Sequence, residues 1–218
     1  MSDVIKVDVW SDIACPWCYI GKRKFEAGAE AFAGEVEVTY HSFELAPDTP
    51  VDFDGSELDF LAQYKGMSPE QVKPMLDRVT DIAKDVGLDY DYDALQHTNT
   101  IKAHQLIHFA KAHGKQLEAK ERLLKAYFVE GRHVGRTDDL ADLAEEIGLD
   151  RAQAKRALEN DEYLDDVRAD QQQAIGYGIR GVPFFVIDGK YGVSGAQAPE
   201  TFAQALKQVQ DEHAGVAS

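Results

Sequence analysis

The 218-residue sequence contains only two cysteines, Cys15 and Cys18. So small a number excludes the multi-bridge framework of small secreted proteins, which needs several cross-links between distant segments. No apolar run approaches the ~20 residues that a transmembrane helix requires. The first residues, Met-Ser-Asp-Val-Ile-Lys, lack the basic stretch, the long apolar run and the cleavage site of a signal peptide. We therefore expect a cytoplasmic protein that does not enter a membrane.

Basic residues are also scarce relative to acidic ones. The sequence has 23 lysines and arginines against 39 aspartates and glutamates, which gives a formal net charge of −16. Such an excess of negative charge repels nucleic-acid phosphates and anionic lipid surfaces. We therefore expect no nucleic-acid partner and no membrane partner. The content of 44% hydrophobic and 28% charged residues is typical of a globular protein with a buried core.

The two ends of the sequence have the pattern of an α/β fold. Residues 4–10 form a short β-branched run, which predicts a buried strand. Residues 19–32 have helical spacing, and the alternating residues 35–40 predict a second strand. Near the other end, residues 183–187 predict a further strand, which is followed by an Asp-Gly turn and a short strand over 191–193. Pro199 then begins a final helix.

The middle of the sequence carries helix signals and no convincing strand. Ser56 and Ser68 are suitable N-cap residues, and Pro69 and Gln71 complete the typical start of a helix that contains Pro74. Further helices are predicted over residues 100–113, 116–129, 138–147, 151–159 and 161–175. We interpret the chain as one α/β domain, formed by residues 1–50 and 178–218, that carries an all-helical insert domain over residues 51–177.

The two cysteines lie in the motif Cys15-Pro16-Trp17-Cys18, at the predicted start of a helix. A helix N-terminus favours a thiolate, so we expect a lowered pKa at Cys15 and not at Cys18. Cys18 lies one turn further along the same face, within reach of a small disulfide ring. In a redox pair, one thiolate attacks a substrate disulfide and the second thiol resolves the mixed disulfide.

Three alternative roles for the cysteine pair are less favoured. A zinc site needs four ligands, and His41 or His104 would have to be recruited singly. A purely structural disulfide closing so short a loop removes little chain entropy. The thiols could also be incidental. His104 and His108 share a helical face, but without a thiol or carboxylate partner a packed face is a better interpretation than a metal pair. We expect no bound metal.

Two motifs together resemble a known family. The segment from Ser11-Asp12 through the cysteine motif to Gly21, followed later by Gly181-Val182-Pro183-Phe184-Phe185, resembles the thioredoxin superfamily. Within it the likeness is to the DsbA-like, FrnE-type group. The order of elements is also similar: strand, active-site helix, strand, helical insert, proline-led strand and final helix. The resemblance implies a thioredoxin-like α/β fold with a large helical insert.

The resemblance also implies an activity and a set of site residues. The activity would be thiol–disulfide oxidoreductase or isomerase chemistry, through a redox-active disulfide between Cys15 and Cys18 and without a bound cofactor. Pro183 would be a cis proline that faces the cysteines, and the backbone of Val182 would pair with an extended substrate. Pro16 and Trp17 would also contact the substrate, because the indole offers an apolar surface.

Other expected positions are less well supported by the residues. Asn99 and His104 resemble insert positions that overhang the active site and contact substrate. Related proteins often have a buried acid about six residues before the first cysteine, where this chain has Val9. The proton acceptor for Cys18 is therefore unassigned, with Glu44 and His41 as candidates.

Two alternative functions come from other classes of protein. The architecture is similar to 2-hydroxychromene-2-carboxylate isomerases and kappa-class glutathione transferases, which use bound glutathione. Those proteins generally carry serine where Cys15 stands, and an acidic residue where this chain has Gln197. The second alternative is a peptide-binding chaperone that uses the groove beside Val182. We favour the oxidoreductase, with protein or small-molecule thiol and disulfide substrates and with glutathione as a candidate reducing partner.

Overall fold

The computed structural model describes residues 4–32 and 34–216, which form four strands and nine helices. The start of the chain considered for a signal peptide lies partly outside the described residues. The strands are β1 (Ile5–Ser11), β2 (Val36–Ser42), β3 (Phe184–Ile187) and β4 (Tyr191–Ser194). The helices are α1 (Pro16–Phe32), α2 (Glu57–Lys65), α3 (Pro69–Lys84), α4 (Ile101–Ala112), α5 (Gln116–Phe128), α6 (Thr137–Glu146), α7 (Arg151–Glu159), α8 (Leu164–Gly176) and α9 (Pro199–Val216). The predicted strands and helices are present, with ends shifted by a few residues.

The four strands form one mixed sheet in the order β2-β1-β3-β4. β1 pairs with β2 in parallel and with β3 antiparallel. The side chains of β1 alternate between the two faces: Ile5, Val7 and Val9 enter one core, whereas Trp10 belongs to a separate cluster with Ala174. Both faces of the sheet are therefore buried.

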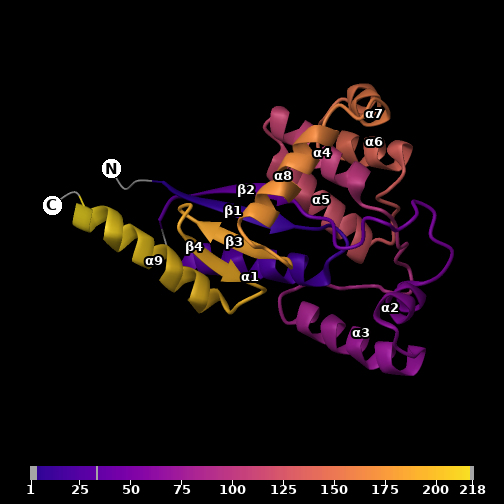
Figure 1. The fold of residues 1–218 in the computed structure, drawn as a ribbon, viewed down its shortest axis with the longest axis horizontal. Coiled ribbons are helices and arrows are strands. Elements are labelled where there is room, and N and C mark those ends of the chain that lie inside the picture. Colours follow the sequence, from indigo (N-terminus) through magenta and orange to yellow (C-terminus); the bar gives the residue numbers. More distant parts are fainter. Residues whose placement is uncertain (1–3, 33, 217–218) are drawn as a thin grey trace.

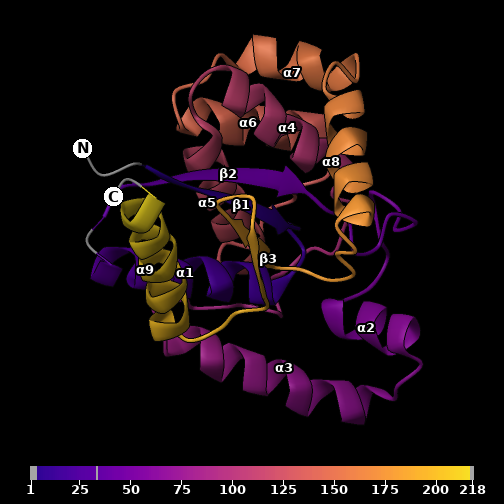
Figure 2. The same cartoon turned by 60° about the vertical axis from the view of Figure 1, so that its left-hand side comes forward.

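Helices α1 and α9 cover one face of the sheet (Figures 1 and 2). Phe25 of α1 packs against Phe185 of β3 and Phe202 of α9. The two helices approach closely at Gly28, because a Cβ atom there would lie 2.5 Å from the carbonyl oxygen of Pro199. Gly28 is therefore needed for the spacing between α1 and α9.

Helices α4 to α8 gather on the opposite side of the sheet, and α2 and α3 lie at one end, beside α1 (Figure 2). We call α2–α8, the helices between β2 and β3, the interstrand helices. Apolar side chains of α3 to α7 form a large core, which also takes in Tyr19 and Ile20 of α1. The first turns of α1 thus pack against this core, while Phe25 further along the helix packs on the sheet.

An ionic cluster ties α1 to α5. The carboxylate of Glu121 accepts a hydrogen bond from the Tyr19 hydroxyl at 2.7 Å and forms ion pairs with Lys22 at 2.6 Å and with Arg23. Burial opposes the charge on Glu121, but the hydrogen bonds from Arg23, Lys22 and Tyr19 outweigh it and lower its pKa to about 2. Glu121 is therefore ionised at neutral pH.

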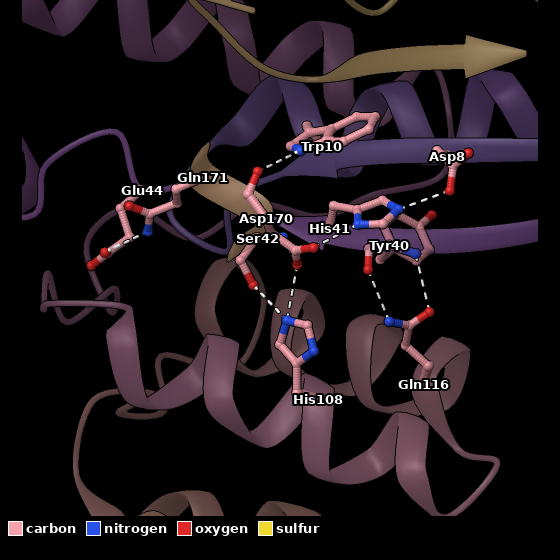
Figure 3. Close-up of polar contacts among 10 residues, drawn as sticks. All are labelled: Asp8, Trp10, Tyr40, His41, Ser42, Glu44, His108, Gln116, Asp170 and Gln171. Atoms are coloured by element: carbon pink, nitrogen blue, oxygen red, sulfur yellow. Dashed lines mark hydrogen bonds and ion pairs between the residues drawn. The ribbon is translucent and has the colours of Figure 1, made fainter. Parts of the chain in front are cut away.

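A second polar network joins β2 to α4 and α8 (Figure 3). The carboxylate of Asp170 lies 2.7 Å from His41 Nδ1 and 2.9 Å from His108 Nε2, and it accepts from the backbone N–H of Ser42 at 2.8 Å. The other ring nitrogen of His41 lies 2.8 Å from Asp8. Burial opposes both charges, yet these contacts lower the pKa of Asp170 and raise the pKa of His41.

The outer edge of β2 is covered by a side chain. Gln116 of α5 donates to the carbonyl oxygen of Tyr40 at 2.9 Å and accepts from its N–H at 3.0 Å (Figure 3). One amide group thereby satisfies both backbone groups of Tyr40, as a neighbouring strand would do.

Candidate active site

The cysteine motif lies where β1 leads into α1. Cys15 immediately precedes the helix and Cys18 lies in its first turn, where its N–H donates to the carbonyl oxygen of Cys15 at 3.0 Å. Both cysteines are free thiols and both are 3% exposed. Their sulfur atoms share a hydrogen bond. The spacing predicted from the sequence therefore brings the two thiols into contact.

The proline-led motif lies beside the first cysteine, as the resemblance implied. The peptide bond between Val182 and Pro183 is cis. The Cys15 thiol donates a hydrogen bond to the carbonyl oxygen of Val182 at 3.5 Å. Gly21 of α1 lies so close to Pro183 that a Cβ atom there would come within 2.9 Å of its Cγ. The two sequence motifs are thus parts of one site.

The pKa values of the two thiols differ from the expectation. The hydrogen bond with Cys18, together with burial, raises the pKa of Cys15 well above its ordinary value. Burial also opposes ionisation of Cys18, but the bond with Cys15, the charge of Lys120 and the Ser11 hydroxyl outweigh it and lower the pKa of Cys18. The prediction of a lowered pKa at Cys15 and not at Cys18 was therefore wrong, because the neighbouring thiol and burial raise the pKa of Cys15, whereas Lys120 and Ser11 help to lower that of Cys18.

Lys120 was missed by the sequence analysis. It lies on α5, is 1% exposed, and its ammonium nitrogen is 5.5 Å from the centre of the Tyr40 ring. Burial lowers the pKa of Lys120, and the negative charges that oppose this shift are those of Cys18, Asp12 and Cys15. In the sequence Lys120 is one of several charged residues of α5, and only the packing of α5 against β2 reveals that it is buried.

Asp12 was also missed, although it follows β1 directly. It is 1% exposed, and its carboxylate accepts hydrogen bonds from the N–H of Leu45 at 2.8 Å and the Thr100 hydroxyl at 2.8 Å. His104 Nε2 lies 3.0 Å from the same carboxylate. Burial opposes the charge, but these contacts outweigh it and lower the pKa of Asp12. Asp12 therefore holds the cysteine loop against α4 as an ionised group.

Four residues that the sequence analysis considered for the site make contacts elsewhere in the fold. His104 is 1% exposed and turned toward Asp12, so it does not overhang the site as expected. The side chain of Asn99 bonds to the carbonyl oxygen of Pro47 and to the start of α4. Of the two candidate proton acceptors, His41 belongs to the network with Asp170, and Glu44 accepts from Gln171 (Figure 3). These four side chains hold loops and helices in place.

A pocket of about 530 Å³ opens beside Cys15. Pro16, Trp17 and Val182 line it together with Cys15, so the expected substrate-contacting residues do meet there. Trp17 is 37% exposed. The carbonyl oxygen of Pro16 accepts a hydrogen bond from the Tyr90 hydroxyl at 2.7 Å, which fixes the motif at the pocket wall.

Metal ligation finds no support in the side-chain arrangement. Within residues 4–32 and 34–216, no group of three or more histidine, cysteine or acidic side chains is arranged to hold a metal ion. His104 and His108 are bound to different carboxylates, those of Asp12 and Asp170.

Within residues 4–32 and 34–216, no helix is both long and apolar enough to cross a bilayer.

Several solved structures share this fold. The cytosolic disulfide reductase DsbM from Pseudomonas aeruginosa, solved with GSH, is 19% identical, covers 93% of this chain and 98% of its own, and superposes with a TM-score of 0.67. A 2-hydroxychromene-2-carboxylate isomerase is 17% identical over 98% of this chain and 100% of its own, with a TM-score of 0.73. Identities this low show the fold alone.

Two proteins are more similar in sequence. A probable DsbA oxidoreductase from Streptomyces coelicolor is 41% identical, over 95% of this chain and 91% of its own, with a TM-score of 0.89. The uncharacterised protein YwbO from Bacillus subtilis is 34% identical over 213 residues, 94% of this chain and 98% of its own. The profile of the DsbA-like thioredoxin domain matches residues 6–207, which confirms the expected fold class. The chain belongs to the DsbA-like thioredoxin domain family.

Proposed function

We propose that this protein is a thiol–disulfide oxidoreductase in which Cys15 attacks the substrate and Cys18 resolves the mixed disulfide. The observation that carries the proposal is the position of Cys15. Its thiol lines the pocket and lies between the thiol of Cys18 and the carbonyl oxygen of Val182. Access to the substrate, and not the lower pKa, assigns the attacking role to Cys15.

The reduction of a substrate disulfide proceeds in two exchanges. In the first, Cys18 begins as the thiolate, which its lowered pKa favours, and takes the proton of Cys15 as the Cys15 sulfur bonds to one substrate sulfur and the other leaves as a thiolate. In the second, Cys18 gives its proton to that departing thiolate and attacks the Cys15 sulfur. A disulfide forms between Cys15 and Cys18, and the second substrate sulfur leaves as a thiolate. Two electrons pass from the cysteine pair to the substrate.

Lys120 supports the second exchange. In the mixed disulfide Cys15 no longer has a proton to share, so the Lys120 ammonium and the Ser11 hydroxyl become the leading groups that favour the Cys18 thiolate. Lys120 is a positioning residue, because its charge acts on Cys18 and not on the substrate. Related proteins often have a buried acid at the position of Val9, and in this chain Lys120 is instead the buried ionisable group near Cys18.

The substrate contacts follow from the pocket. We propose that Trp17 and Pro16 contact the apolar part of a substrate and that the backbone at Val182 and Pro183 pairs with an extended segment. DsbM, which shares the fold, is named as a cytosolic disulfide reductase and was solved with GSH. That supports a cytoplasmic location and glutathione as the reducing partner of this chain.

Glutathione-dependent isomerisation remains the second candidate, because the isomerase fold superposes over nearly the whole chain. Two features favour the oxidoreductase over it. An isomerase needs one activating group, whereas here a second thiol is hydrogen-bonded to the first. Gln197 bonds to the carbonyl oxygen of Ser194 and supplies no charge for an amine of glutathione.

The test uses Cys18→Ser and Cys15→Ser with insulin as the disulfide substrate and a chromene carboxylate with glutathione as the isomerase substrate. We expect wild-type turnover of insulin, a stable mixed disulfide at Cys15 in Cys18→Ser, and no adduct at residue 18 in Cys15→Ser. Robust isomerisation that survives Cys18→Ser would overturn the oxidoreductase and support the alternative. Adducts at Cys18 in the wild type would reverse the two roles.

A further inference from the structure

The pocket beside Cys15 has the properties of a small-molecule site. Its volume of about 530 Å³ falls within the range of ~300–1,000 Å³ typical of such sites. Apolar side chains from the loop after β2, from α2 and from α3 form much of its lining: Leu45, Phe60, Leu61, Met75, Leu76 and Val79. A folded protein presents a broad surface, so a concave apolar pocket of this size suits a compact ligand better.

His97, one of the residues that line the pocket, has a ring nitrogen without a hydrogen-bond partner among the described residues. His97 is 4% exposed, and its Nδ1 lies 2.7 Å from the carboxylate of Glu57. The ring is stacked on Phe60 with centroids 3.5 Å apart, so its orientation is fixed. Its Nε2 is buried without a hydrogen-bond partner among the described residues. Buried polar atoms are normally paired, so this nitrogen is suited to bind a ligand.

Tyr92 also lines the pocket and carries a second unpaired polar atom. The hydroxyl of Tyr92 is buried and also lacks a hydrogen-bond partner within the described part of the chain. Two polar groups in an otherwise apolar cavity are the arrangement that orients a small organic ligand. The aromatic rings of Trp17, Phe60 and Tyr64 also line the pocket and provide flat surfaces for a ring.

The charges of the pocket favour an anionic substituent. Both of its carboxylates are engaged, that of Asp12 with His104 and that of Glu57 with His97. Its two cations, Lys65 and Arg78, have exposed side chains. These two cations are the groups of the pocket lining that can pair with a carboxylate.

We propose that the pocket formed by Cys15, His97 and Tyr92 binds small aromatic disulfides that carry a carboxylate, and that these are preferred over aliphatic disulfides. This rests on the proposed function and names the substrate class of the same site. The aromatic ring lies among the apolar side chains, and Tyr92 and His97 Nε2 hydrogen-bond its polar substituents. The exchange at Cys15 is the one described above, with an aromatic thiolate as the first leaving group.

The probes are dithiobis(nitrobenzoate), an aromatic disulfide with carboxylates, and bis(hydroxyethyl) disulfide, an aliphatic one. Each is mixed in excess with the reduced full-length protein, and the single-turnover rate is measured against probe concentration. Tyr92→Phe removes the free hydroxyl and keeps the ring, and Leu61→Trp narrows the pocket. Tyr177→Phe, at an exposed tyrosine outside the pocket, is the matched control.

We expect saturation with the aromatic probe in the wild type and in Tyr177→Phe. The half-saturating concentration should rise about fivefold in Tyr92→Phe, the effect of one lost hydrogen bond, and by more in Leu61→Trp. The aliphatic probe should react at the same rate in all four proteins. If the aromatic probe shows no saturation, or if the variants change both probes equally, the inference is overturned while the oxidoreductase stands. If the wild type reduces neither probe nor insulin, the proposed function itself fails.

Discussion

The thiol of Cys15 and the carbonyl oxygen of Val182 are 3.5 Å apart, although 167 residues separate them in the chain. The contact depends on the closeness of α1 to the segment before β3. Gly21 allows that closeness, because its missing side chain leaves room for Pro183. The position of the Cys15 sulfur relative to Val182 therefore depends partly on Gly21, in the second turn of α1.

We predict that Gly21→Ala slows disulfide exchange and lowers stability. The added Cβ would lie 2.9 Å from Pro183 Cγ, which forces α1 away from Val182. The free energy of unfolding should fall by roughly 1–3 kcal/mol, as for other overpacked sites. Thermal unfolding and insulin reduction measure the two effects.

Alanine substitutions at two other glycines distinguish a general loss of stability from a specific effect on the site. Gly28→Ala should lose comparable stability, because its Cβ would lie 2.5 Å from the Pro199 carbonyl oxygen, but its effect on exchange should be smaller. Gly176→Ala should change neither quantity, since a Cβ there meets nothing within 4 Å. Equal exchange rates in Gly21→Ala and Gly28→Ala would count against a role for Gly21 in positioning the site.

We predict that Lys120→Met lengthens the lifetime of the mixed disulfide at Cys15 by about tenfold, the effect of losing one charge-assisted interaction. Without the ammonium, the pKa of Cys18 rises, and less of it is thiolate at neutral pH. Acid quenching followed by mass spectrometry measures the lifetime as a function of pH. The exposed Lys125 on the same helix provides the control, Lys125→Met. An unchanged pH profile in Lys120→Met would show that Lys120 has only a packing role.

We predict that Asp170→Asn is strongly destabilising, and most so in mildly acidic solution. The lowered pKa of Asp170 means that its contribution is complete above its ordinary pKa of 3.8 and is lost as the pH falls below it. The raised pKa of His41 means that its contribution is complete below its ordinary pKa of 6.5 and is lost as the pH rises through the raised value. The network therefore stabilises most between these two pH values.

Urea unfolding tests this at pH values below, within and above that window. Within it, Asp170→Asn should cost roughly 3 kcal/mol, because it leaves partners of a buried charge network unpaired. The difference from wild type should shrink on both sides. Asp166→Asn, at an exposed position on the same helix, should have little effect. A difference that does not vary with pH would contradict the assignment of charge to this network.

We predict that Glu121→Gln weakens the attachment of α1 to α5 at neutral pH and not in acid. The pKa of Glu121 is lowered to about 2, so its stabilising effect is present above 4.5 and is lost as the pH falls from there toward 2. The expected cost at neutral pH is about 1 kcal/mol, because the side chain is one-third exposed and solvent weakens the ion pairs. Chemical unfolding at neutral and acidic pH measures it, with the exposed Glu118→Gln as control. A cost that persists in strong acid would refute the ionic origin of the effect.

Local patterns predicted most of the secondary structure. Ser56 and Ser68 do precede helices, the expected capping box of Ser68 is present, and Gly66 ends α2 in the left-handed conformation. The cysteine motif and Pro183 can be found because each is a short, distinctive sequence. Periodicity and turn residues are local properties, so a single sequence records them directly.

The missing parts of the site are those made by distant contacts. Lys120, Asp12 and His97 look like ordinary polar residues in the sequence, and their burial depends on how the interstrand helices pack on the sheet. His104 does lie near the start of α4, but it is buried against Asp12 and is not among the residues that line the pocket, and nothing local in the sequence indicates that contact. The reversed pKa order of the two thiols has the same origin.

The amide of Gln116 also bears on how the molecule behaves in a crowded solution. An uncovered outer strand offers its backbone groups to other chains and can start aggregation. At Tyr40 both groups are already taken by Gln116, and β2 therefore presents a weaker template at this buried residue. An extended chain that approaches the far edge of the sheet therefore finds no free backbone N–H or carbonyl group at Tyr40 with which to pair.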